Sequence, residues 1–132
     1  MVFIVELTKN VNGINFGADR KDIRKAFGGK YKELKKSFLA NNTMDAYKDF
    51  HIYYDNNNCF EAIEIFDGNE LRIEGKRVFP GGVSELKRII GDLSQEEYGG
   101  YISVNKSVGV TMSTDKPEEM ESILIGCKNY YG

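Results

Sequence analysis

Residues 50–66, FHIYYDNNNCFEAIEIF, contain the clearest β-hairpin of the chain. His51–Asp55 and Cys59–Phe66 are rich in β-branched and aromatic residues, which favour strands. The three asparagines between them tolerate the left-handed backbone that tight turns require. This stretch therefore predicts two antiparallel strands joined by a short turn.

Strand and turn signals continue beyond this hairpin. Asp67-Gly68-Asn69 predicts a turn before a strand at Glu70–Glu74, and Gly75-Lys76 predicts another before Arg77–Phe79. We interpret the whole run as an antiparallel meander. Further strands are predicted at Tyr101–Ser113, with a bend near Ser107, and at Met120–Lys128.

Upstream, the pattern predicts a strand at Val2–Leu7 and a short helix that runs to about Phe27. Asp19 suits the N-cap, where a carboxylate accepts free backbone N–H groups, and Gly28-Gly29 suits the helix end. Tyr31–Phe38 favours a strand, with a second helix as the alternative. The helix is expected to bury Ile23, Ala26 and Phe27, and to expose Arg20, Lys21, Arg24 and Lys25.

A second helix is predicted at Val83–Leu93, after the break at Pro80-Gly81-Gly82. Its apolar residues follow the spacing of one buried helical face: Val83, Leu86, Ile89, Ile90 and Leu93. Residues 22–28 and 85–91 share one pattern: acidic, aliphatic, basic, basic, apolar, apolar, glycine. We expect a single α+β domain over residues 1–132, in which an antiparallel sheet packs on two short helices. A duplicated helix-plus-strands unit is one alternative.

Length and composition fit one ordinary globular domain. The 132 residues are 41% hydrophobic and 29% charged, and 18 basic against 20 acidic side chains give a net charge of −2. This balance gives no general reason to expect nucleic acid or an anionic membrane as a partner. The apolar run Val2–Val5 is too short for a signal peptide, so a cytoplasmic location with Cys59 and Cys127 as reduced thiols is expected.

The sequence offers little for catalysis. The only histidine, His51, has no recognisable nucleophile motif to serve, and no P-loop or zinc-type spacing is present. Asp55–Asn58 superficially resembles a calcium loop but lacks its central glycine and terminal glutamate. We therefore expect no enzyme activity, no metal and no cofactor, and leave an enzyme of unrecognised type as an alternative.

The charges are segregated along the chain. Residues 19–36 form a basic group, with eight basic side chains against three acids: Arg20, Lys21, Arg24, Lys25, Lys30, Lys32, Lys35 and Lys36. Residues 45–74 reverse the balance, with Asp45, Asp49, Asp55, Glu61, Glu64, Asp67, Glu70 and Glu74 among the aromatic side chains Tyr47, Phe50, Tyr53, Tyr54, Phe60 and Phe66.

Acids interleaved with aromatic residues suit a protein-binding surface, because aromatic side chains anchor a partner while acids steer a basic one. The alternative is that the acids are solvated and the aromatic residues fill the core. Glu61 and Glu64 would lie on opposite faces of a regular strand, so not all candidates share one surface. The candidate contact residues are Asp49, Tyr53, Tyr54, Asp55, Glu61 and Glu64.

Two resemblances bear on function. Ile14–Ile23, followed by Phe27-Gly28-Gly29, resembles the phrase that opens a module of the β-lactamase inhibitory protein and of related outer-membrane lipoprotein assembly domains, although Ala18 replaces the usual methionine. The layout of Phe50–Phe66 and Tyr101–Tyr131 is similar to that of small bacterial immunity proteins of polymorphic toxin systems.

The second resemblance implies a compact cytoplasmic protein, acidic on one face, that blocks the active site of a toxin. Our hypothesis is therefore a non-catalytic module that neutralises a protein partner, such as a basic nuclease toxin. A small-ligand-binding or structural domain that self-associates is the alternative.

Overall fold

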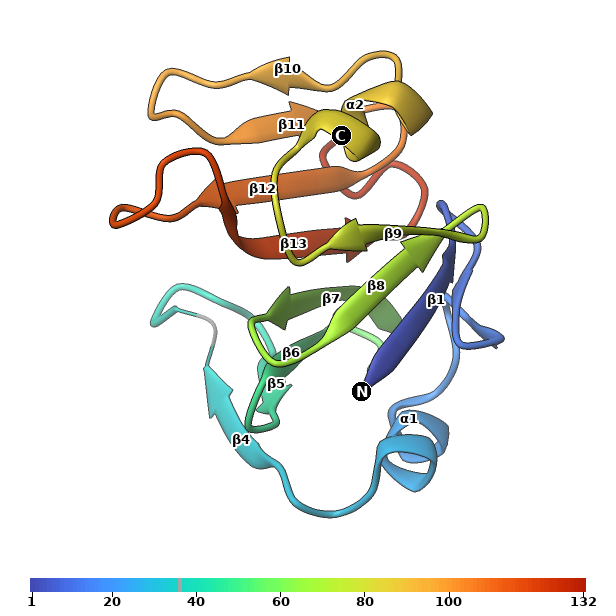
Figure 1. The fold of residues 1–132 in the computed structure, drawn as a ribbon. Coiled ribbons are helices and arrows are strands. Elements are labelled where there is room, and N and C mark those ends of the chain that lie inside the picture. Colours follow the sequence, from blue (N-terminus) through green and yellow to red (C-terminus); the bar gives the residue numbers. More distant parts are fainter. Residues whose placement is uncertain (36) are drawn as a thin grey trace.

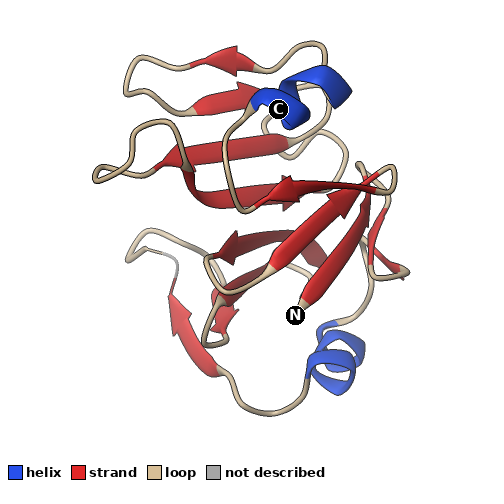
Figure 2. Cartoon of the chain, in the orientation of Figure 1, coloured by secondary structure: helices blue, strands red, loops and turns tan. Residues whose placement is uncertain are grey.

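The computed structural model describes residues 1–35 and 37–132, which form a mostly β protein with two short helices. The strands make two sheets, and the helices lie at opposite ends of the molecule (Figures 1 and 2). The α+β class with an antiparallel sheet is confirmed. No helix within the described ranges is long and apolar enough to cross a membrane.

The larger sheet is antiparallel and has eight strands. Both strands of the predicted hairpin lie near its centre and pair with each other through a bulge. In spatial order the strands are β10 (Ser94–Gln95), β11 (Tyr101–Ser103), β12 (Val108–Met112), β13 (Met120–Gly126), β7 (Phe60–Phe66), β6 (Phe50–Tyr54), β5 (Thr43–Ala46) and β4 (Lys32–Lys35).

The smaller sheet has five strands and mixed directions. Its order is β3 (Ile14–Asn15), β2 (Asn10–Val11), β1 (Val2–Glu6), β8 (Glu70–Ile73) and β9 (Lys76–Phe79). The β8–β9 hairpin was predicted, but the interpretation of residues 51–79 as one meander was wrong. After β7 the chain crosses to the second sheet, where β8 pairs in parallel with β1.

The element order repeats along the chain. Helix α1 (Arg20–Phe27) is followed by β4 to β7, and helix α2 (Ser84–Ile89) is followed by β10 to β13. The two four-stranded halves meet where β7 pairs with β13, so the strand order is mirrored about that contact. This repeated order of elements is what the alternative of a duplicated helix-plus-strands unit predicts.

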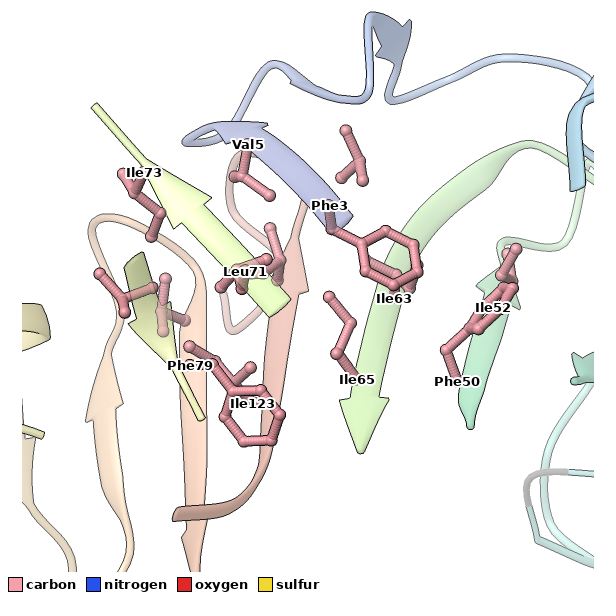
Figure 3. Packing of buried hydrophobic residues seen from close by; sticks show 14 of the residues in the cluster. Phe3, Val5, Phe50, Ile52, Ile63, Ile65, Leu71, Ile73, Phe79 and Ile123 are labelled. Carbon is pink, nitrogen blue, oxygen red and sulfur yellow. The ribbon is translucent and has the colours of Figure 1, made fainter. Parts of the chain in front are cut away.

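The core lies between the inner faces of the two sheets (Figure 3). Phe3 and Leu71 of the smaller sheet, and Ile63, Ile65 and Ile123 of the larger one, are fully buried. In β1 these positions alternate with exposed ones, as expected for a sheet with one apolar face. On the central strands β7 and β13 some residues of the opposite face, such as Ala62 and Ser122, are buried as well. Apolar burial between the two layers is the main stabilising contribution.

The predicted helix α1 is confirmed, including its cap. Asp19 Oδ1 accepts a hydrogen bond from the Lys21 amide at 3.0 Å, and Gly28 ends the helix with a φ of 92°. Ile23 is buried as expected, but Ala26 is exposed because the buried face passes instead through positions 20, 23, 24 and 27.

The second helix is shorter than predicted. All five apolar positions of the predicted stripe pack on the core. The helix nevertheless ends at Ile89, because Ile90 has an extended backbone (φ −105°, ψ 101°) and leads the chain toward β10. Its buried face was thus predicted correctly, but its length was not.

Two other predicted strands are present in altered form. Tyr101–Ser113 is a hairpin and not one bent strand, because Ser107 takes a positive φ of 55° in the turn between β11 and β12. The strand predicted at Tyr31–Phe38 is present as β4. Lys36, which belonged to that strand and to the basic group, lies outside the described residues.

Candidate functional site

A buried carboxylate organises one end of the larger sheet. Asp45 of β5 is fully buried and accepts hydrogen bonds from Arg20 and Arg24 of α1, at 2.8 to 3.0 Å. The Tyr54 hydroxyl also donates to Asp45, at 2.8 Å, and the Arg20 guanidinium lies 4.2 Å above the Tyr54 ring. The expectation that Arg20 and Arg24 face water was therefore wrong: these cations fasten α1 to the sheet.

Arg20 extends this network to two loops. It donates to the side chains of Asn42 and Thr43 at the start of β5, and to Asn58 in the β6–β7 hairpin. Asn42 in turn donates to the Asp55 carbonyl at 2.7 Å and to Asn58 Oδ1 at 2.9 Å. One buried arginine thus sets the relative positions of the segments that surround the hairpin.

The Asp45 network makes the stability of the folded state depend on pH. Burial alone would raise the pKa of Asp45, but hydrogen bonds from Arg24, Arg20 and Tyr54 outweigh it and hold that pKa below its ordinary value of 3.8. A carboxylate whose pKa is lower in the folded state than in the unfolded state stabilises the folded state at pH values above its ordinary pKa. This contribution is lost as the pH falls through the pKa of the folded state.

We expect the free energy of unfolding of the wild type to decrease as pH falls from above 3.8 to below the folded pKa of Asp45. Urea unfolding at a series of pH values measures this slope. In Asp45→Asn the slope should be smaller, because the group that titrates is gone. Equal slopes for both proteins would contradict the assignment.

Four candidate residues meet at a shallow cleft beside the β6–β7 hairpin. Tyr53, Tyr54, Asp55 and Glu61 line a cavity of about 210 Å³, which we call the hairpin cleft. Its other walls come from β5, the hairpin tip and the segment before β5: Ala40, Asn41, Asn42, Thr43, Met44 and Asn56. The cleft is therefore polar and acidic, with an apolar patch at Met44 and Ala40.

The backbone of the hairpin positions the two acids of the hairpin cleft in different ways. Asp55 Oδ1 accepts from the amides of Asn57 and Cys59, at 2.9 and 3.0 Å. The pairing register shifts between Tyr53 and Tyr54, so Glu61 is an extra residue on β7. Such a bulge re-aims the side chain that it contains, so the alternation of a regular strand, which was assumed in comparing Glu61 with Glu64, does not apply at Glu61.

Tyr53 connects the hairpin cleft to the open face of the larger sheet, the face opposite the main core. Its hydroxyl donates to Glu64 Oε1 at 2.8 Å, and Ser122 of β13 donates to Glu64 Oε2 at 3.0 Å. Met44 and Ala62 pack beside Tyr53 in a second, smaller apolar cluster. Glu64 is thus joined to the cleft through one tyrosine, although it does not line it.

Asp49 lies apart from the other candidates. It precedes β6, whereas Asp55 follows that strand, so their separation is roughly 20 Å at about 3.4 Å per residue. The aromatic residues of the acidic segment are mostly buried, as the alternative interpretation expected. Tyr54 is only 4% exposed and Tyr53 only 7%, so these tyrosines form the floor of the cleft and do not protrude from it.

The remaining reactive side chains are scattered over the described residues. His51 lies against Phe66 on the open face, and burial lowers its pKa. Cys59 and Cys127 are free thiols, and burial raises the pKa of Cys127. In the described part of the chain, no three His, Cys, Asp or Glu side chains are grouped closely enough to hold a metal ion.

Comparisons of the chain with protein-family models, with curated proteins and with solved structures found no match. The resemblances to inhibitory and immunity proteins therefore stay hypotheses.

Proposed function

We propose that this protein is a non-catalytic inhibitor of the immunity-protein kind, which neutralises a basic partner by binding one of its cationic side chains in the hairpin cleft. The observation that carries the proposal is the convergence of Asp55, Glu61 and Tyr53 at one cavity. At about 210 Å³ it is below the roughly 300–1,000 Å³ typical of small-molecule sites. A single side chain of a larger partner suits it better.

The chemistry of the cleft favours lysine or arginine. The aliphatic stem of such a side chain can pack against Met44 and Tyr53 while its charged head reaches Asp55 and Glu61. Charge-assisted hydrogen bonds to carboxylates are stronger than neutral ones. Because backbone amides already fix the Asp55 carboxylate, little side-chain entropy remains to be lost on binding. A basic nuclease toxin is the partner class that this proposal favours.

The test removes the two charges of the cleft without removing its shape. Asp55→Asn with Glu61→Gln keeps an oxygen at position 55 for the two backbone amides. Asp115→Asn with Glu118→Gln, in the loop between β12 and β13, is the matched control. Each protein is used to capture partners from a lysate of the source cells, and calorimetry with the purified partner then gives affinities.

We expect one stoichiometric partner for the wild type and the control, with binding that weakens as salt increases. The cleft variant should bind at least about tenfold more weakly, because a desolvated charge pair typically contributes 2 kcal/mol or more on truncation. An empty eluate from the wild type, or equal affinities of all three proteins, would contradict the proposal.

A further inference from the structure

The edge of the larger sheet at β4 is unusually open. Among the described residues, β4 pairs with β5 on one side only (Figure 1). All four of its side chains, Lys32 to Lys35, are exposed. Leu34 is 45% exposed, and Phe38 and Leu39 just beyond the strand are 86% and 78% exposed. Unpaired strand edges with exposed apolar side chains are templates for another strand.

Leu34 ends a row of apolar residues that crosses the sheet. It is the cross-strand partner of Met44, which pairs with Tyr53, which pairs with Ala62. The last three are buried, whereas Leu34 lies on the edge strand and has no paired residue on its outer side in the described part of the chain. A further strand that places an apolar side chain opposite Leu34 would continue the row and cover it.

The charge pattern of β4 makes it complementary to itself. In an antiparallel pair of two copies centred on Leu34, Glu33 of each copy faces Lys35 of the other, and the two Leu34 side chains meet on the axis. Centring the pair on Lys32, Glu33 or Lys35 sets two like charges opposite each other, which is destabilising. Glu33 is already held by Arg24 and Thr43, with its side chain half-exposed.

We propose that the protein forms a two-fold symmetric dimer in which the β4 strands of two copies pair antiparallel about Leu34, giving one continuous sheet. Such an interface is isologous, so each contact occurs twice. Because the paired segment is only the short strand Lys32–Lys35, we expect a reversible dimer.

The oligomeric state of the full chain tests this proposal. Sedimentation equilibrium from micromolar to millimolar concentration should show the mass rising from 15.0 kDa toward twice that value. Lys35→Glu places acids opposite Glu33 at both ends and should weaken the dimer roughly tenfold or more. Arg77→Glu, the same charge change on the exposed edge strand β9, is the matched control and should leave the dimer unchanged.

Mixing two variants tests the proposed pairing directly. Glu33→Lys alone should also weaken the dimer, but an equimolar mixture with Lys35→Glu restores opposite charges in both pairs and should form a heterodimer. Leu34→Lys, which sets two cations on the axis, provides an independent variant should Glu33→Lys disturb folding. Any of three results would overturn the proposal. These are a wild type that is monomeric at every concentration, a dimer that Lys35→Glu does not weaken, and a mixture of the two variants that stays monomeric.

Discussion

Replacing Asp45 with asparagine is expected to lower the free energy of unfolding by about 3–5 kcal/mol, the range found when one partner of a buried ion pair is removed. Asp45 is fully buried, and two arginines and the Tyr54 hydroxyl all donate to it. Without the carboxylate, Arg20 and Arg24 stay close together with no buried counter-charge. Urea unfolding at neutral pH, followed by circular dichroism, measures the loss.

Glu33→Gln is the matched control for this variant. Glu33 pairs with the same Arg24, at 2.8 Å, but its side chain is half-exposed. Exposed ion pairs contribute about 0–1 kcal/mol, so the control should lose no more than that. Similar losses of unfolding free energy in both variants would show that the contribution of the Asp45 contacts to stability does not depend on the burial of Asp45.

The sequence predicted those parts of the fold that depend on local signals. The 50–66 hairpin, the Asp19 cap and the apolar face of α2 each follow from residues close together in the chain, and each is present. The parallel pairing of β1 with β8 joins segments about seventy residues apart and has no local signal. Because this pairing was not predicted, residues 51–79 were wrongly interpreted as one meander.

The candidate site was predicted only in part, because only some of its residues are positioned by local signals. Asp55 and Tyr53 flank a turn that the sequence locates, and they do share the hairpin cleft. The position of Glu61 depends on a bulge, which alternation cannot foresee. The Asp45 network was overlooked although a signal existed: positions 20, 23, 24 and 27 form one helical face. Two arginines on the face that contains Ile23 require a buried acid.

That same helical face ends at Phe27, where an aromatic cluster joins the two sheets. Phe3 of β1 is fully buried, with its ring 5.2 Å from Phe50 of β6 and 6.2 Å from Phe27 of α1. Phe50 stacks on Tyr47 at 4.6 Å, and the Tyr47 hydroxyl donates to the Gly28 carbonyl that follows the helix. One side chain of the smaller sheet therefore contacts both the larger sheet and α1.

Phe3→Ala should consequently lower the free energy of unfolding by about 3–5 kcal/mol, because it leaves a cavity where three elements meet and removes aromatic pairs. The neighbouring Ile4→Ala is the matched control. Ile4 lies on the same strand but is 60% exposed, so its loss should be below about 0.5 kcal/mol. Urea unfolding of both variants gives the comparison. If the two losses were alike, Phe3 would not join the layers, and the attachment of the smaller sheet would have to depend on β8 and β9 instead.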